Sequence, residues 1–171
     1  QLYFHTGKDD KLRTIHLQKI GEHLGDDVTA ALIGLHCFSG CDSVSSFFGR
    51  GKTKTAKLLI QHDEFLPAFQ ALGESFTVRQ DTVTLLDKFV CKLYGRSGCS
   101  DVNSARYQMF KEATRAENVM PPNSDALYKH IQRANYQTGI FKLSLEQHPA
   151  IPSPVGHGWK MVDSELAIDW M

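Results

Sequence analysis

The sequence lacks any apolar run approaching the ~20 residues that a membrane-spanning helix needs, and its first residues lack the layout of a secretory signal. It also lacks net charge, because 19 Lys and Arg balance 19 Asp and Glu. No global field therefore draws the chain to nucleic acid or to an acidic membrane, and any such binding must come from a local patch. We expect no membrane partner.

Cysteine is scarce, and its spacing is irregular. The four cysteines, Cys37, Cys41, Cys91 and Cys99, are too few for a small disulfide scaffold. Cys37 and Cys41 lie beside His36, which leaves a metal-thiolate site as an alternative, but closed zinc sites usually take two closely spaced cysteine pairs. We predict reduced thiols in an intracellular protein, nuclear or cytoplasmic.

Residues 49–57 form the most informative stretch of the chain. Gly49 and Gly51 permit positive φ and close backbone approach, so a turn here can leave the first N–H groups of the following helix unpaired. Four positive charges occur within residues 50–57, and no acid interrupts them. Such a helix start can bind phosphate through both charge and hydrogen bonds. The plain alternative is a glycine-rich turn before an ordinary solvated lysine face.

The surrounding sequence narrows the choice between these two interpretations. An apolar helix ends in Gly40-Cys41-Asp42, and seven residues after Asp42 a Gly-x-Gly turn, Gly49-Arg50-Gly51, opens a basic helix that ends in Leu58-Leu59-Ile60. This order resembles the helix-two-turn-helix region of the flap-endonuclease branch of PIN-like nucleases. The resemblance covers about one third of the chain. It departs from the family at Ser43, where an aromatic residue is common, and at Thr55, where alanine is expected.

The resemblance implies a function and a set of site residues. It implies that Asp42 is a ligand of Mg²⁺ or Mn²⁺ and that the turn binds the backbone of duplex DNA without sequence specificity, with a possible K⁺ ion at the turn. The implied DNA-binding residues are Gly49, Arg50, Gly51, Lys52, Thr53, Lys54, Thr55 and Lys57. Two-metal phosphodiester hydrolysis needs several carboxylates, and the resemblance places the others on an upstream PIN-like segment of the same or another chain.

Hydrophobic periodicity predicts a mainly α-helical fold. We expect a helical bundle containing the helix-two-turn-helix motif (15–72), one N-terminal strand near residues 2–6 left from a PIN-like α/β sheet, and a small C-terminal β-hairpin. A loop near Gly95 divides the chain into residues 1–95, the PIN-like portion, and 96–171, a helical extension with a proline-rich connector. The expected helices span 15–24, 26–38, 52–60, 63–73, 82–94, 102–116 and 124 to at least 136, with hairpin strands at 159–162 and 166–170.

Three functions remain open at this point. The first is DNA-backbone binding as part of a metal-dependent, structure-specific nuclease, with Asp42 completing the metal site. The second is a nuclease-derived module that binds DNA or protein but has lost catalysis. The third is a helical interaction domain in which the Gly-x-Gly turn only packs helices. The chain also resembles animal proteins derived from mobile elements, through segments such as Met120-Pro121-Pro122 and Arg133-Ala134-Asn135-Tyr136-Gln137, but that resemblance implies no activity.

Overall fold

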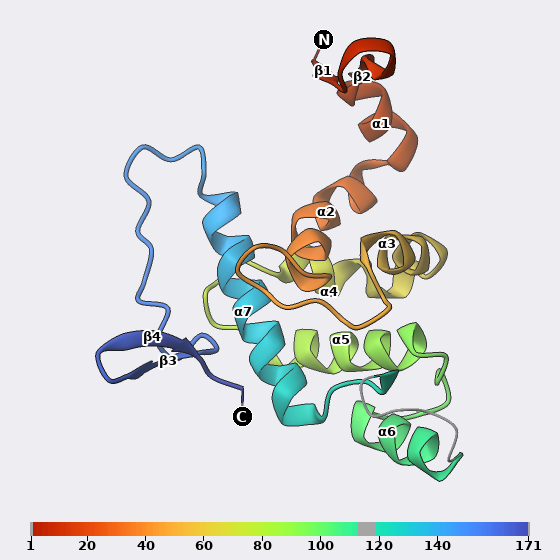
Figure 1. Ribbon diagram of the computed structural model, residues 1–171, viewed down its shortest axis with the longest axis vertical. Helices are drawn as coiled ribbons and strands as arrows, with labels where there is room; N and C mark the ends of the chain where they lie inside the picture. The colour runs from red at the N-terminus through yellow and green to blue at the C-terminus, as the bar shows by residue number, and fades with distance from the viewer. Residues whose placement is uncertain (1, 113–118, 171) are drawn as a thin grey trace.

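The fold is mainly helical, as predicted. A computed structural model describes residues 2–112 and 119–170, and within them it contains seven α-helices and two small antiparallel hairpins (Figure 1). The helices are α1 (Leu17–Leu24), α2 (Asp26–Phe38), α3 (Lys52–Gln61), α4 (Leu66–Ala71), α5 (Gln80–Leu93), α6 (Val102–Lys111) and α7 (Ser124–Lys142). Short 3₁₀ turns, η1 (Asp9–Lys11) and η2 (Asp63–Phe65), complete the helical elements. No helix in this described part is both long and apolar enough to cross a bilayer.

The N-terminal strand does not stand alone, and here the sequence analysis was wrong in detail. Strand β1 (Tyr3–Thr6) pairs with β2 (Arg13–His16) in an antiparallel hairpin, with Phe4 opposite Ile15. Thr14, directly before the expected helix start at residue 15, lies in β2, and its hydroxyl contacts His5 Nδ1 at 2.9 Å. Helix α1 begins only at Leu17, where the His16 ring accepts a hydrogen bond from the Lys19 N–H.

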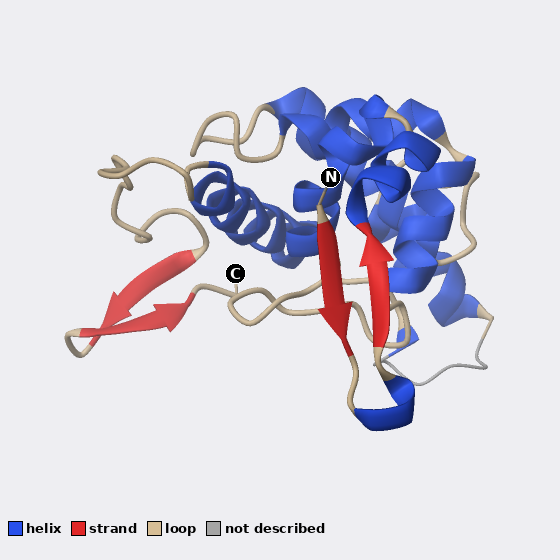
Figure 2. Cartoon of the chain, turned by 90° about the horizontal axis from the view of Figure 1, so that it is seen from above, coloured by secondary structure: helices blue, strands red, loops and turns tan. Residues whose placement is uncertain are grey.

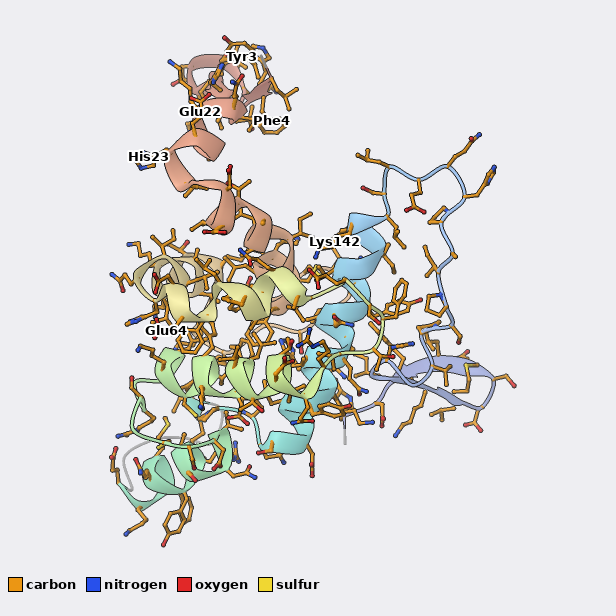
Figure 3. The ribbon with its side chains drawn as sticks, turned by 180° about the vertical axis from the view of Figure 1, so that it is seen from behind. Tyr3, Phe4, Glu22, His23, Glu64 and Lys142 are labelled. Atoms are coloured by element: carbon orange, nitrogen blue, oxygen red, sulfur yellow. The ribbon has the colours of Figure 1, made fainter. Side chains whose placement is uncertain are left out.

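The hairpin and α1 form an arm that projects from the helical body (Figure 1). None of the α1 residues is buried, and the arm exposes large apolar side chains, among them Leu2, Phe4 and Leu12. Figure 3 shows that Tyr3, Phe4, Glu22 and His23 lie away from the packed helices. The arm therefore contributes little to the core, which α2 and the later helices build.

The core is an aromatic cluster centred on Phe38, the last residue of α2. Its ring packs edge-on against Phe69 of α4 and Phe89 of α5, at centroid distances of 5.4 and 6.2 Å, and against His130 of α7 at 5.2 Å. Helices α2 and α4 come so close that a Cβ at Gly34 would lie 2.3 Å from the Phe69 carbonyl oxygen. The α2 sequence needs glycine there because any side chain would collide with backbone.

Helix α7 crosses the bundle and joins the two halves of the chain. It contacts both α2 and α5, and Leu127, Ile131 and Ala134 belong to the same buried cluster as Phe38. The predicted division after residue 95 therefore does not separate two hydrophobic cores. Helix α7 begins at Ser124 as predicted, capped by the Asn123 side chain. Residues 113–116 of the predicted sixth helix lie outside the described residues.

The C-terminal hairpin is confirmed. Strands β3 (Trp159–Val162) and β4 (Glu165–Ile168) pair across a two-residue turn, Asp163-Ser164, in which both residues have positive φ. Positive φ at both central positions gives the twist that a tight hairpin requires. Figure 2 shows this hairpin apart from the N-terminal one, and the two form separate sheets.

Candidate nucleic-acid interface

The loop between α2 and α3 carries the candidate site, and two buried side chains hold it on the body. Val44 and Phe47 are buried in the core, while Cys41 and Val44 exchange backbone hydrogen bonds of 2.9 and 3.2 Å across a tight turn. Gly40 has φ +108°, and a Cβ there would lie 2.6 Å from the Ser46 Cβ. The glycine of the Gly-Cys-Asp motif thus lets the loop fold back across the end of α2.

The second turn opens α3 in the manner that the glycines predict. Gly49 has φ +66°, and Gly51 is the N-cap residue with an extended backbone and no side-chain cap. The Gly51 carbonyl accepts from the N–H groups of Lys54 and Thr55. In the described residues the N–H groups of Lys52 and Thr53 have no hydrogen-bond partner. A helix start with free donors and no acid in its first turn attracts anions.

Two of the predicted DNA-binding side chains hold the turn together instead of facing a ligand. The Lys52 ammonium donates to the carbonyl oxygens of His36, at 2.9 Å, and Gly40, which caps the C-terminal end of α2. Thr55 is fully buried, and its hydroxyl lies within hydrogen-bonding distance of the Arg50 and Gly51 carbonyls. Lys52 and Thr55 therefore act on a ligand only through the turn that they hold.

We expect Lys52→Ala to lower the free energy of unfolding by about 1 kcal/mol, because it removes a charged donor from the terminal carbonyls of α2. Lys54→Ala is the matched control. The Lys54 ammonium contacts only the Gly49 carbonyl, at 2.9 Å, so its loss should cost much less. Chemical denaturation of the two variants measures the difference. Equal losses would show that Lys52 does not cap α2.

The other cations line a groove between α3 and the end of α5. Arg50 is anchored there, since its Nε donates to the Leu93 carbonyl at 3.2 Å and its guanidinium lies 5.0 Å from the centre of the Tyr94 ring. Lys54 and Lys57 of α3 and Lys92 of α5 complete the set. The groove has a volume of about 440 Å³, and its lining contains four cations and no carboxylate.

Lys92 is the one member of this set that the sequence analysis missed. It lies 35 residues after Lys57, and only the packing of α3 against α5 brings it to the groove. The nearest opposing charge is Glu64, labelled in Figure 3, which lies 3.4 Å from the Lys92 ammonium. Both partners are partly exposed, so the pair is weak. No local sequence pattern could have identified Lys92.

Asp42 lies at a different opening, on the other side of the turn. It lines a pocket of about 790 Å³ together with His36, Cys41, Lys52 and Gln137. Partial burial and the Lys52 ammonium lower the pKa of His36, and Asp42 opposes that shift. The lining of the pocket thus contains one carboxylate, Asp42, and one lysine, Lys52.

The donors near Asp42 do not by themselves fit Mg²⁺ or Mn²⁺. Across residues 2–112 and 119–170, no group of three or more His, Cys, Asp and Glu side chains is arranged to hold a metal ion. Mg²⁺ requires octahedral oxygen coordination, whereas Asp42 supplies one carboxylate next to an ammonium. A K⁺ ion at the turn would compete with Lys54 and Arg50, which both donate to the Gly49 carbonyl. We derive no catalytic step through either ion.

The four cysteines are free thiols in this structure. Cys37 and Cys91 are buried. Burial raises the pKa of Cys37 to about 11 and that of Cys91 to about 12, so both are protonated near neutral pH. Neither is a reactive thiolate.

Comparison of the chain with protein-family models, with curated proteins and with solved structures finds no match. The functional argument therefore rests on the turn and its groove. The structure brings Arg50, Lys54 and Lys57 to one groove beside the free N–H groups of α3, and it separates them from Asp42 and from the structural pair Lys52 and Thr55.

Proposed function

We propose that the Gly49–Gly51 turn and the groove beside it bind the phosphate backbone of nucleic acid, and duplex DNA in particular. One observation carries the proposal: Arg50, Lys54, Lys57 and Lys92 line a single groove that has no carboxylate in its wall. A solvated lysine face normally mixes both signs of charge. Here the cations of two helices converge beside a helix start whose first donors are free.

The chemistry of this surface favours backbone contacts over base recognition. Lysine and arginine bind phosphate as charged donors, and the free N–H groups of Lys52 and Thr53 add directed hydrogen bonds. The groove wall offers only one amide side chain, Gln61, for reading a base edge. Binding should therefore be insensitive to sequence. Because the chain has no net charge, its affinity should depend on this patch and fall steeply with salt.

Replacing both Lys54 and Lys57 with alanine should remove two phosphate contacts. The slope of log K against log[salt] for duplex DNA should then become shallower by about 1.8, since each neutralised phosphate contributes about 0.9. Fluorescence anisotropy of a labelled duplex, titrated at low and at physiological salt, measures this slope. The variant should remain folded, because both side chains are exposed.

Lys8→Ala combined with Lys11→Ala is the charge-matched control. These lysines lie on the N-terminal arm, away from the groove, and are also exposed. The control should leave the slope unchanged. If both double variants change the slope equally, binding reflects total charge and the groove has no special role. If the wild type does not bind DNA at all, the turn only packs helices, as in a helical interaction domain.

The proposal extends to nuclease activity only with carboxylates from elsewhere. The resemblance to PIN-like nucleases implies an upstream segment with the remaining acids, which would join Asp42 to hold Mg²⁺ or Mn²⁺. The exposed apolar side chains of the arm, such as Phe4 and Leu12, are a surface against which such a segment could pack. A binding module without catalysis is the alternative function, because the described residues bring only Asp42 to the pocket.

Cleavage of duplex and flap DNA in the presence of Mg²⁺ or Mn²⁺ distinguishes the two functions. A nuclease should lose cleavage in Asp42→Asn while keeping its DNA affinity, because Asp42 lies outside the groove. A binding module should show affinity without cleavage. Either function places the protein in the nucleus or the cytoplasm, where its free thiols would stay reduced.

A further inference from the structure

Arg133 of α7 is a buried cation without a carboxylate bonded to it. Its side chain is 1% exposed. One terminal nitrogen, Nη1, donates to the backbone carbonyls of Gly158 at 3.2 Å and Asp169 at 2.9 Å, and the guanidinium lies 5.3 Å from the centre of the Trp170 ring. The Nε atom has no hydrogen-bond partner among residues 2–112 and 119–170. Buried arginines usually pair with an acid, so this arrangement is incomplete.

The carboxylate of Asp169, whose backbone carbonyl accepts from Arg133, already pairs with two other cations. The Asp169 carboxylate bonds to the Lys129 ammonium and lies 3.2 Å from that of Lys160. One negative charge thus faces three positive ones. Burial lowers the pKa of Arg133, and Asp169 only partly opposes this. An under-compensated buried charge is unfavourable, and an anion bound beside it would relieve that cost.

A cavity lies next to this arginine. Its volume is about 160 Å³, and Arg133 and Trp170 line it together with loop residues Ser45 and Phe47 and with Met120 and Pro122. A cavity of roughly 150 Å³ holds a benzene ring. The cavity is therefore large enough, and its walls are apolar enough, to hold one ring-sized group.

Among the described residues, Arg133 is the only positively charged one in the cavity wall. His130 also lines it, but both ring nitrogens are occupied: Nε2 lies 2.8 Å from the Phe38 carbonyl and Nδ1 lies 3.2 Å from the Ser45 hydroxyl. The nitrogen bonded to the carbonyl, Nε2, must be the donor. Burial lowers the pKa of His130 to about 4, so near neutral pH the imidazole is uncharged and Nδ1 accepts from Ser45. One guanidinium among apolar walls suits a monoanion better than a phosphate dianion.

We propose that this cavity binds a small carboxylate that carries a ring-sized apolar body. The carboxylate pairs with the Arg133 guanidinium, whose planar fork matches two carboxylate oxygens. The apolar body occupies the space between Phe47, Met120 and Trp170. Because the loop residues Ser45 to Phe48 form one wall, the ligand also stabilises the loop that leads to the Gly49–Gly51 turn. The inference does not depend on nucleic-acid binding.

The test compares benzoate, benzamide and inorganic phosphate on the full chain. Benzamide has the shape of benzoate without the charge, and phosphate has the charge without the ring. We expect saturable binding of benzoate, seen by calorimetry and by a change in tryptophan fluorescence from Trp170, with benzamide and phosphate at least tenfold weaker. Bound benzoate should raise the melting temperature, because it binds only the folded state.

Two variants locate the ligand. Ala126→Leu places a larger side chain into the cavity wall from α7 without touching the guanidinium, and it should abolish benzoate binding. Arg133→Lys keeps the charge but removes the planar fork, and it should weaken binding at least tenfold. Arg79→Lys, at an exposed arginine paired with Asp81, is the control and should bind as the wild type does.

Several results would overturn the proposal. Equal binding of benzamide and benzoate would show that Arg133 contributes nothing. Equal binding of phosphate and benzoate would indicate a general anion site instead of a carboxylate pocket. Unchanged binding in Ala126→Leu would place the ligand elsewhere, and no binding of benzoate by the folded wild type would reject the site itself.

Discussion

Acidification from pH 7 to pH 4 is expected to lower the free energy of unfolding by about 3 kcal/mol through one side chain, His130. Burial lowers the pKa of its imidazole to about 4, against about 6.5 in the unfolded chain. Above pH 6.5 neither state binds this proton. Below it the unfolded state binds the proton first, so stability falls as the pH drops from about 6.5 to 4, by about 1.4 kcal/mol for each unit.

The position of His130 explains the size of the effect. Its ring packs between Phe38 and Phe47, at centroid distances of 5.2 and 4.7 Å, and Arg133 one turn along α7 further disfavours a second positive charge. Protonation would turn Nδ1 into a donor, which the Ser45 hydroxyl oxygen can still accept. The charged form is therefore disfavoured by lost solvation and by the charge of Arg133.

Urea denaturation at a series of pH values measures this dependence, and His130→Gln provides the control. Glutamine keeps a donor for the Phe38 carbonyl but does not titrate, so the slope between pH 6.5 and 4 should become much shallower even if the variant is less stable at pH 7. An unchanged slope in His130→Gln would assign the acid sensitivity to other groups. Asp87 has the opposite effect on stability. Burial raises the pKa of its carboxyl group, so protonation of this group on acidification favours the folded state.

Local signals explain what the sequence could predict of this fold. Gly51 followed by a basic run starts α3 within one residue of the predicted position, and Asn123 before Ser124 starts α7. The C-terminal hairpin follows from two short apolar runs separated by three polar residues, Asp163-Ser164-Glu165, and the structure places Glu165 in β4. Each of these elements depends on residues that are adjacent in sequence, which is why pattern reading finds it.

The error at β2 has an equally local cause. Residues 14–17 alternate polar and apolar, which suits a strand, but Ile15 and Leu17 also continue the helical spacing of Ile20 and Leu24. Pairing with β1 decides between the two patterns, since Thr14 faces His5 across the hairpin. Single-segment periodicity cannot anticipate that partner, and β-branched Thr14 and Ile15 gain from a strand neighbour.

The residues of the candidate sites also differ in how far the local sequence could predict them. Gly49 was predictable because tolerance of positive φ is a property of glycine itself, whereas the direction of a long side chain is not local; Gly51 adopts φ −68°, which any residue can reach. Lys52 and Lys54 are two residues apart and chemically identical, yet one caps α2 and the other lines the groove. The contribution of Lys92 and the cavity beside Arg133 depend on tertiary packing alone.

Phe38→Ala is expected to lower the free energy of unfolding by about 3–5 kcal/mol, the cost of removing a fully buried aromatic ring and leaving a cavity. Phe38 is 0% exposed and contacts rings from α4, α5, α7 and the loop. A domain has only about 5–15 kcal/mol of stability. Thermal and urea denaturation should therefore show a variant near the limit of folding.

Phe48→Ala is the matched control in the neighbouring loop. Phe48 is 61% exposed and lies one residue before Gly49, so its loss should cost less than about 1 kcal/mol. The comparison also bears on the proposed DNA site. Phe38 anchors the loop through Phe47, at 5.2 Å, so even the folded fraction of Phe38→Ala should bind duplex DNA more weakly, whereas Phe48→Ala should keep the wild-type salt slope. Similar stability losses in both variants would mean that the aromatic cluster is not the core that positions the turn.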